Sequence, residues 1–192
     1  AIDTERVAML RGRAIEQGGA PLSGVKVSVK GHPELGYTVT RGDGEFDMVV
    51  NGGGRLWLQY ERQGYLPVER VTHPGWQRYE RLAEVGLVVA SKKSTTVSSD
   101  SADVQTLIGE AVEDDHSQRT PLVVIEPFTR ATALLPDGTE EALSSLSVSV
   151  TQYPIDPEQR YLPGNPVSLG GVAYGLDFAV KEADGLGARH VA

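Results

Sequence analysis

The residues that could bind a metal ion are dispersed along the chain. A zinc site usually takes its histidines or carboxylates from short intervals, which bring several ligands around one ion. The acidic runs Glu113-Asp114-Asp115 and Glu140-Glu141 lack the ligand spacing of a calcium loop, so we interpret them as solvated turns, with a weak calcium site as the alternative. We expect no metal site and no other cofactor. The four histidines are expected to be structural or solvent-exposed: His32, His73, His116 and His190.

No arrangement of side chains indicates a catalytic nucleophile. The chain has no cysteine, which excludes a thiolate nucleophile, a disulfide and a cysteine-bound zinc ion. Its serines do not occur in the Gly-x-Ser-x-Gly turn of serine hydrolases, and no histidine lies in a recognisable partner motif. Asn51-Gly52-Gly53-Gly54 links two predicted strands, so its glycines serve a bend and not a phosphate-binding loop. We therefore predict that the protein is not an enzyme.

Arg41-Gly42-Asp43 spells the tripeptide that some integrins recognise on an exposed loop. Local geometry also explains it, because Asp43-Gly44 supplies the positive φ angles of a tight hairpin and Gly42 relieves the same turn. We favour the structural interpretation. Arg41 and Asp43 remain candidate binding residues for adhesion.

Four aromatic residues could form a flat platform for a sugar ring. They are Trp57, Tyr60, Trp76 and Tyr79. The alternation along residues 56–60 places Tyr60 on the core side of a strand, and Trp57 on the opposite face could pack against a following domain. Trp57 and Trp76 are therefore kept as candidate carbohydrate-binding residues.

Composition and charge limit the kinds of molecule that the chain is expected to bind. The 192 residues include 26 acidic and 18 basic side chains, a net charge of −8, without a basic stripe that could neutralise a nucleic acid backbone. No apolar run approaches the roughly 18 residues of a membrane-spanning helix. The N-terminus does not resemble a signal peptide, so we expect a mature chain or a fragment. The absence of cysteine favours a bacterial source over an animal secreted protein.

Apolar and polar residues alternate along the first half, which is typical of half-buried β-strands. Val25, Val27 and Val29, for example, fall on one face of a strand. With 22 glycines and 11 prolines, turns are frequent enough to separate short strands. We predict an all-β fold in which residues 1–92 form a seven-stranded antiparallel sandwich. Its strands are expected near residues 9–15, 25–30, 38–40, 45–50, 56–60, 65–71 and 85–90.

Residues 93–103 are predicted to be a linker, because they are small and polar and bury too little apolar surface to offset the entropy of ordering. Threonine favours strands, so part of this stretch could instead be an edge strand. Residues 104–192 are predicted to form a second, incomplete β domain. Its strands are expected near residues 104–112, 122–125, 131–135, 146–150 and 172–180, with a proline-rich loop at 154–170 and one helical turn at 181–186.

The first half resembles the carboxypeptidase regulatory-like, transthyretin-like sandwich family. The resemblance lies in Gly12-Arg13-Ala14, the turn-rich segment 18–27, the hairpin segment 38–46 and Gly64-Tyr65. In that family these glycine-proline, Asp-Gly-x-Phe and Gly-Tyr signatures are structural. The resemblance therefore implies a β-sandwich without catalysis.

A narrower resemblance is to the version of this sandwich in teneurins and bacterial YD-repeat (RHS) proteins. It lies in segments 32–38, 46–47 and 50–53, and more loosely in 131–139, 162–164 and 173–178 of the second half. The resemblance implies that the sandwich precedes a plug-like β domain and a large YD-repeat shell, which in relatives encloses a toxin or displays adhesion surfaces.

We therefore predict a non-catalytic structural and interaction module of a secreted or cell-surface, bacterial, teneurin-like YD-repeat protein. Its expected partner is the remainder of its own polypeptide, the YD-repeat shell, on which it docks or which it caps. Nucleic acid binding and membrane insertion are not expected. The alternative is a surface adhesion or carbohydrate-binding module that contacts a cell-surface protein or a glycan.

Overall fold

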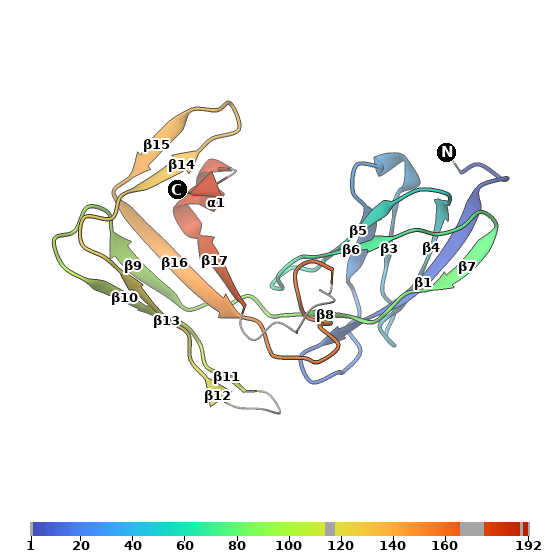
Figure 1. The fold of residues 1–192 in the computed structure, drawn as a ribbon, viewed down its shortest axis with the longest axis horizontal. Helices are drawn as coiled ribbons and strands as arrows, with labels where there is room; N and C mark the ends of the chain where they lie inside the picture. Colours follow the sequence, from blue (N-terminus) through green and yellow to red (C-terminus); the bar gives the residue numbers. More distant parts are fainter. Residues whose placement is uncertain (1, 114–117, 166–174, 189, 192) are drawn as a thin grey trace. The chain divides into compact units, whose positions relative to one another are not determined.

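The computed structural model of the protein describes residues 2–113, 118–165, 175–188, 190 and 191. Residue contacts divide the chain into two compact units (Figure 1). The first contains residues 1–90 and 155–173, and the second contains residues 91–154 and 174–192. Part of the segment that we expected in a continuous second domain, residues 104–192, therefore packs with the first unit instead. The first unit is discontinuous in sequence.

The first unit is a β-sandwich, which confirms the predicted fold class. Its elements are β1 (Val7–Glu16), β2 (Lys26–Val29), the 3-10 helix η1 (Pro33–Leu35), β3 (Tyr37–Val39), β4 (Glu45–Asn51), β5 (Leu56–Glu61), β6 (Val68–Thr72), β7 (Arg78–Arg81) and β8 (Val85–Leu87). One sheet has the order β4-β1-β7, with β8 also paired to β1, and the other has the order β3-β2-β5-β6 (Figure 1).

The core of this sandwich consists of the alternating apolar residues that the sequence placed on one face. Val25 and Val27 are completely buried, as are Phe46 and Leu58. The Phe46 and Tyr60 rings meet edge to face across the two sheets, with centroids 5.8 Å apart. Each such side chain contributes roughly 1.5–3 kcal/mol by leaving water. The period-two pattern was therefore sufficient to find the core.

Strand β7 was not predicted, so the unit has one strand more than the seven expected. Its residues are exposed except Glu80, which is half-buried, so they lack apolar alternation. The strand forms because β1 has backbone groups free on that side, and it pairs parallel to β1 with Met9 opposite Tyr79. β8 also pairs parallel to β1. The expectation of a wholly antiparallel sandwich was wrong at these two strands.

The second unit contains several small sheets and one short helix. Its elements are β9 (Ser94–Ser98), β10 (Gln105–Ile108), β11 (Val112–Glu113), β12 (Gln118–Arg119), β13 (Leu122–Ile125), β14 (Ala131–Leu134), β15 (Glu140–Leu143), β16 (Ser145–Gln152), β17 (Leu176–Val180), α1 (Lys181–Leu186) and β18 (His190–Val191). The strands pair in the orders β17-β16-β9, β15-β14-β18, β10-β13 and β11-β12. Their apolar core includes Val97, Leu107, Leu146 and Val148.

Strand β9 corrects the predicted linker at residues 93–103. The strand pairs antiparallel to β16, with Val97 opposite Leu146, and lies at the edge of its sheet. Its single apolar side chain, Val97, is buried, which explains why a composition rule for linkers missed it. The alternative of a threonine-rich edge strand was the right one.

The proline-rich segment has no strand or helix over residues 154–165, as predicted. Pro166, and the part of the predicted strand 172–180 up to Tyr174, lie outside the described residues. The predicted helical turn at 181–186 is α1, which ends at Gly187 with a φ of 63°. Within the described residues, neither helix has the length and apolar content needed to cross a bilayer.

Candidate functional site

The first unit has a cavity of about 450 Å³ between edge strand β6 and the region of β7 and β8. Apolar side chains on its walls include Leu58, Leu82 and Val85, and Tyr60 also lines it. Ligand sites in proteins usually have volumes of about 300 to 1,000 Å³, an apolar lining and a few placed polar groups. The cavity has this size and composition.

Arg70 projects inward from β6 at one wall of the cavity. Its Nη2 donates to the carbonyl oxygen of Arg160 at 2.7 Å, and its Nη1 donates to the carbonyl oxygens of Leu162, at 2.9 Å, and Gly164. Burial lowers the pKa of Arg70, while the neighbouring Tyr60 acts in the opposite direction. A guanidinium remains charged under these conditions, so Arg70 holds three backbone carbonyl groups of residues 160–164 with charge-assisted hydrogen bonds.

Residues 156–165, which we call the strap, cover the outer edge of β6. The amide of Glu69 donates to the carbonyl oxygen of Pro163, and the amide of Val71 donates to Asn165 Oδ1, both at 2.8 Å. On the other sheet, the Gly86 amide donates to the carbonyl oxygen of Arg160 at 2.9 Å. Uncovered edge strands present free amides that pair with other chains. The strap satisfies these amides within the molecule.

The strap is also held by its own charges and by an aromatic residue. Arg160 pairs with Asp156 at 2.8 Å and with Glu84 of the sandwich at 3.7 Å. The hydrogen bond with Asp156 raises the pKa of Arg160. The Tyr161 hydroxyl donates to the carbonyl oxygen of Glu16 at 3.1 Å. Ion pairs and the Tyr161 hydrogen bond therefore hold the strap against the part of the sandwich around β1 and β8.

Sequence reasoning did not single out Arg70 or the strap. One signal was present: Val68, Arg70 and Thr72 alternate, and a charged residue between two core positions indicates an inward-facing charge at an edge strand. The sequence does not show which groups bind this charge, because the strap lies about 90 residues further along the chain and has no strand pattern.

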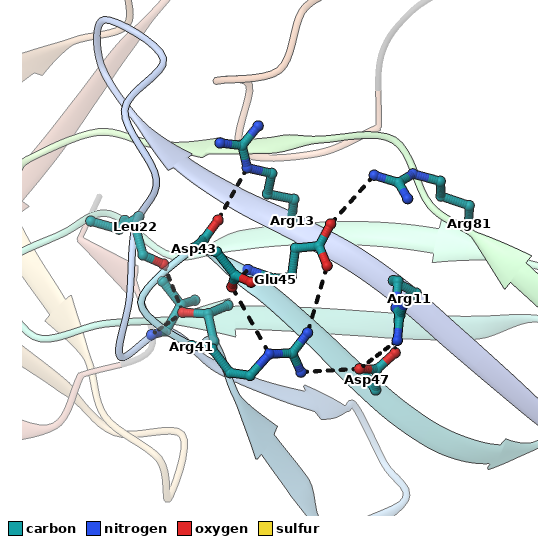
Figure 2. Close-up of polar contacts among 10 residues, drawn as sticks. Arg11, Arg13, Leu22, Arg41, Asp43, Glu45, Asp47 and Arg81 are labelled. Atoms are coloured by element: carbon teal, nitrogen blue, oxygen red, sulfur yellow. Dashed lines mark hydrogen bonds and ion pairs between the residues drawn. The ribbon is translucent and has the colours of Figure 1, made fainter.

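The Arg41-Gly42-Asp43 segment lies in a tight turn between β3 and β4, as predicted, but these strands belong to different sheets, so the expected hairpin between them was wrong. The side chains of Arg41 and Asp43 take part in an ion network (Figure 2). Arg41 contacts Asp47 at 3.0 Å, Glu45 at 3.6 Å and Asp43 at 3.9 Å. Asp43 Oδ1 also accepts the Glu45 amide at 2.9 Å, and Gly44 has the positive φ, 76°, that the turn needs. These contacts agree with the structural interpretation. A role of Arg41 and Asp43 in adhesion stays a prediction.

Replacing Asp47 with asparagine is expected to destabilise the fold in a pH-dependent way. The hydrogen bond from Arg11, at 2.6 Å, lowers the pKa of Asp47, and Arg41 adds to this effect. A carboxylate with a lowered folded pKa stabilises the fold above its unfolded pKa of about 4, and this stabilisation disappears as the pH falls through the folded value.

Urea unfolding of wild type and Asp47→Asn across pH measures this dependence. We expect a lower urea midpoint for the variant at about pH 7 and a difference that shrinks as the pH falls below the unfolded pKa of about 4 and through the lowered pKa of Asp47. Asp103→Asn, which removes an exposed carboxylate outside the network, is the control. A difference that persists unchanged into acid would mean that the charge of Asp47 is irrelevant.

The four aromatic residues proposed as a platform do not come together. Tyr60 is buried in the core, as predicted. Trp57 is exposed on β5, where Arg55 lies over its ring at 5.5 Å, whereas Tyr79 is on β7 of the other sheet. Trp76 is 58% exposed just before β7. The structure instead places Met9 beside Val49 and Tyr79 in an exposed apolar row across three strands, which sequence reasoning missed.

The histidines and acidic runs do not form a metal site in the part of the chain that the structure describes. There, no group of three or more potential ligands is found. His32 contacts Glu34 at 2.9 Å and His73 accepts from Arg55 at 3.3 Å. Glu140 and Glu141 are exposed on β15, and His190 is in β18. His116, Asp114 and Asp115 lie outside the described residues.

The second unit has a largely apolar groove and an apolar outer face. The groove, about 630 Å³, lies between the inner side of β10 and β13, the strands β16 and β17, and α1. The hairpin of β10 and β13 is apolar on both sides, because Leu107 and Val123 point inward while three other residues are exposed. These are Ile108, Leu122 and Val124, at 49%, 59% and 57% exposure.

Comparisons with known proteins give one family and a set of relatives. Residues 2–87 match the model of the "Teneurin TTR-like domain" family. The chain is 30% identical to Teneurin-1 of Gallus gallus over 156 residues, which is 81% of this chain and 5% of the relative. It is 43% identical to Teneurin-3 of Danio rerio over 70 residues, 36% of this chain and 3% of the relative. The chain thus spans a small fraction of these relatives.

A comparison with solved structures gives matches of low sequence identity. A chain of a type II cohesin-X-dockerin complex from Acetivibrio cellulolyticus has a TM-score of 0.37 and 14% sequence identity, over 44% of this chain and 59% of that chain. No functional argument follows from a similarity of this size.

Proposed function

Because residues 2–87 match the teneurin TTR-like domain, we propose that this chain is a non-catalytic structural and interaction module of a larger, teneurin-like surface protein. The first unit supplies a closed sandwich whose β6 edge is covered by the strap. The second unit presents apolar surface for another part of the same polypeptide. Fold by itself does not define function, so the proposal depends on that surface.

The observation that carries the proposal is the apolar outer face of the β10 and β13 hairpin. Ile108 lies directly opposite Leu122, and Val124 is next on the same face. Strands that are apolar on both faces occur where both faces are buried, and contiguous exposed apolar patches commonly mark interaction sites. We infer that a partner covers this face in the working protein.

The partner that we propose is a YD-repeat shell within the same polypeptide, on which the module docks or which it caps. The resemblance of segments in both halves to teneurin-like YD-repeat proteins supports this choice. A bacterial source and a secreted or cell-surface location are parts of the same proposal. Its rival is an adhesion or glycan-binding module that uses the exposed Trp57, Trp76 or Arg41-Gly42-Asp43.

Isothermal titration calorimetry of this chain against the separately expressed repeat region tests the proposal. We expect one-to-one binding with a negative heat-capacity change, the mark of apolar burial. The double variant Leu122→Asp, Val124→Asp is expected to weaken binding about tenfold or more, because it places charges on the docking face.

Val39→Asp is the matched control, since Val39 is 44% exposed on a strand of the first unit. Equal weakening by the control would show that the hairpin face is not the docking surface. If the two parts do not associate while the chain retains glycans through Trp57 or Trp76, the adhesion alternative replaces the proposal.

A further inference from the structure

Tyr60 is a buried residue with a polar end that lines the cavity in the first unit. The residue is 1% exposed, and its ring packs edge to face on Phe46. No hydrogen bond of its hydroxyl is found within the described residues, and the hydroxyl is not one of the fully buried polar atoms that lack a partner. The hydroxyl is therefore accessible, and it is free to donate a hydrogen bond to a molecule in the cavity that Tyr60 lines.

Arg70 does not supply that partner. Its charge acts on Tyr60 from the neighbouring strand, but its guanidinium donates to backbone carbonyls of the strap and offers no acceptor. Both residues line the cavity. A molecule in the cavity could accept a hydrogen bond from this hydroxyl.

The cavity lining indicates what kind of molecule would fit. Its apolar wall includes Leu58, Leu82 and Val85, and its volume of about 450 Å³ exceeds the roughly 150 Å³ of a cavity that holds benzene. The acidic and basic side chains that line the cavity are equal in number. Several of them already form hydrogen bonds or ion pairs, for example Glu80 with Thr72 at 2.6 Å and Glu84 with Arg160. No unbalanced charge selects an ionic ligand.

We propose that this cavity binds a small, uncharged, mainly apolar molecule whose oxygen atom accepts a hydrogen bond from the Tyr60 hydroxyl. Its apolar body lies against Leu58, Leu82 and Val85, and the strap residues Arg160 and Asn165 border the site. The site is independent of the docking face on the second unit, so either proposal can fail without the other.

The probes are acetophenone and ethylbenzene, which have similar shape but differ in the carbonyl oxygen. We expect saturable binding of acetophenone, followed by amide chemical shifts of Leu58, Thr72 and Val85 in nuclear magnetic resonance spectra. Tyr60→Phe, which keeps the buried ring, is expected to weaken acetophenone binding about tenfold and to change ethylbenzene binding less than about twofold.

Tyr65→Phe is the matched control, because Tyr65 belongs to the same unit but does not line the cavity. It is expected to leave both affinities unchanged. Equal acetophenone binding by wild type and Tyr60→Phe would overturn the proposal, as would the absence of saturable binding to wild type.

Urea unfolding provides a second readout. Since the hydroxyl has no protein partner, the urea midpoint of Tyr60→Phe should equal or exceed that of wild type. A clear decrease would show that the hydroxyl is already satisfied in the unliganded protein and would count against the site.

Discussion

Replacement of Arg70 by methionine is expected to lower the free energy of unfolding of the first unit by about 3 kcal/mol. The guanidinium donates to the carbonyl oxygens of Arg160, Leu162 and Gly164, and methionine leaves all three without this donor. Hydrogen bonds to charged groups contribute about 1.5 to 3 kcal/mol each, but the desolvation cost of the buried guanidinium offsets part of their sum.

Two measurements check this prediction. Urea unfolding gives the loss of stability, and native-state trypsin digestion reports release of the strap through faster cleavage after Arg160. Arg78→Met, at an exposed arginine on β7, is the matched control and is expected to change stability by less than about 0.5 kcal/mol. If Arg70→Met unfolds like the control and resists trypsin as wild type does, Arg70 is not the anchor of the strap.

Replacement of Gly44 by alanine is expected to cost about 3 kcal/mol, because two effects combine. A φ of 76° is unfavourable for alanine by about 1 kcal/mol. The added methyl group would also collide with the backbone carbonyl oxygen of Ala14, which cannot move without disturbing the hydrogen bond from the Leu22 amide to that oxygen. Overpacking of this kind costs about 1 to 3 kcal/mol.

Gly42→Ala provides a control from the same loop, since a methyl group there meets no atom within 4 Å. Thermal or urea unfolding of both variants should show a large loss for Gly44→Ala and little change for Gly42→Ala. Similar losses in the two variants would contradict this geometry of the turn. The comparison also separates the structural requirement at Gly44 from any recognition of Arg41-Gly42-Asp43 by a partner.

Because of the strap, the first unit is not a continuous N-terminal half of the chain. Residues 1–90 form the sheets of the sandwich. The amides of Glu69 and Val71 on its edge strand β6, however, donate to the strap, which follows most of the second unit in the sequence. A domain boundary placed at residue 92 would separate the sandwich from the strap that pairs with its edge strand. The chain between residues 91 and 154 is therefore inserted into the first unit in sequence.

Sequence alone was sufficient where the information is local. The alternation of Val25, Val27 and Val29, and of Phe46 with Met48, placed these side chains in the core, because a strand turns successive residues to opposite faces. Asp43-Gly44 predicted the tight turn, since few residues other than glycine adopt a positive φ, but not that the strands on its two sides join different sheets. The buried position of Tyr60 followed from the same alternation.

Only the tertiary structure decided the features that depend on distant partners. β7 has no apolar alternation and exists because β1 offers it a parallel partner. The strap follows β6 because Arg70 and two edge amides bind its carbonyl and amide oxygens across about 90 residues of sequence. The cavity beside Tyr60 arises between these elements. Backbone hydrogen bonds can pair any two segments that meet, so they leave no local pattern in either segment.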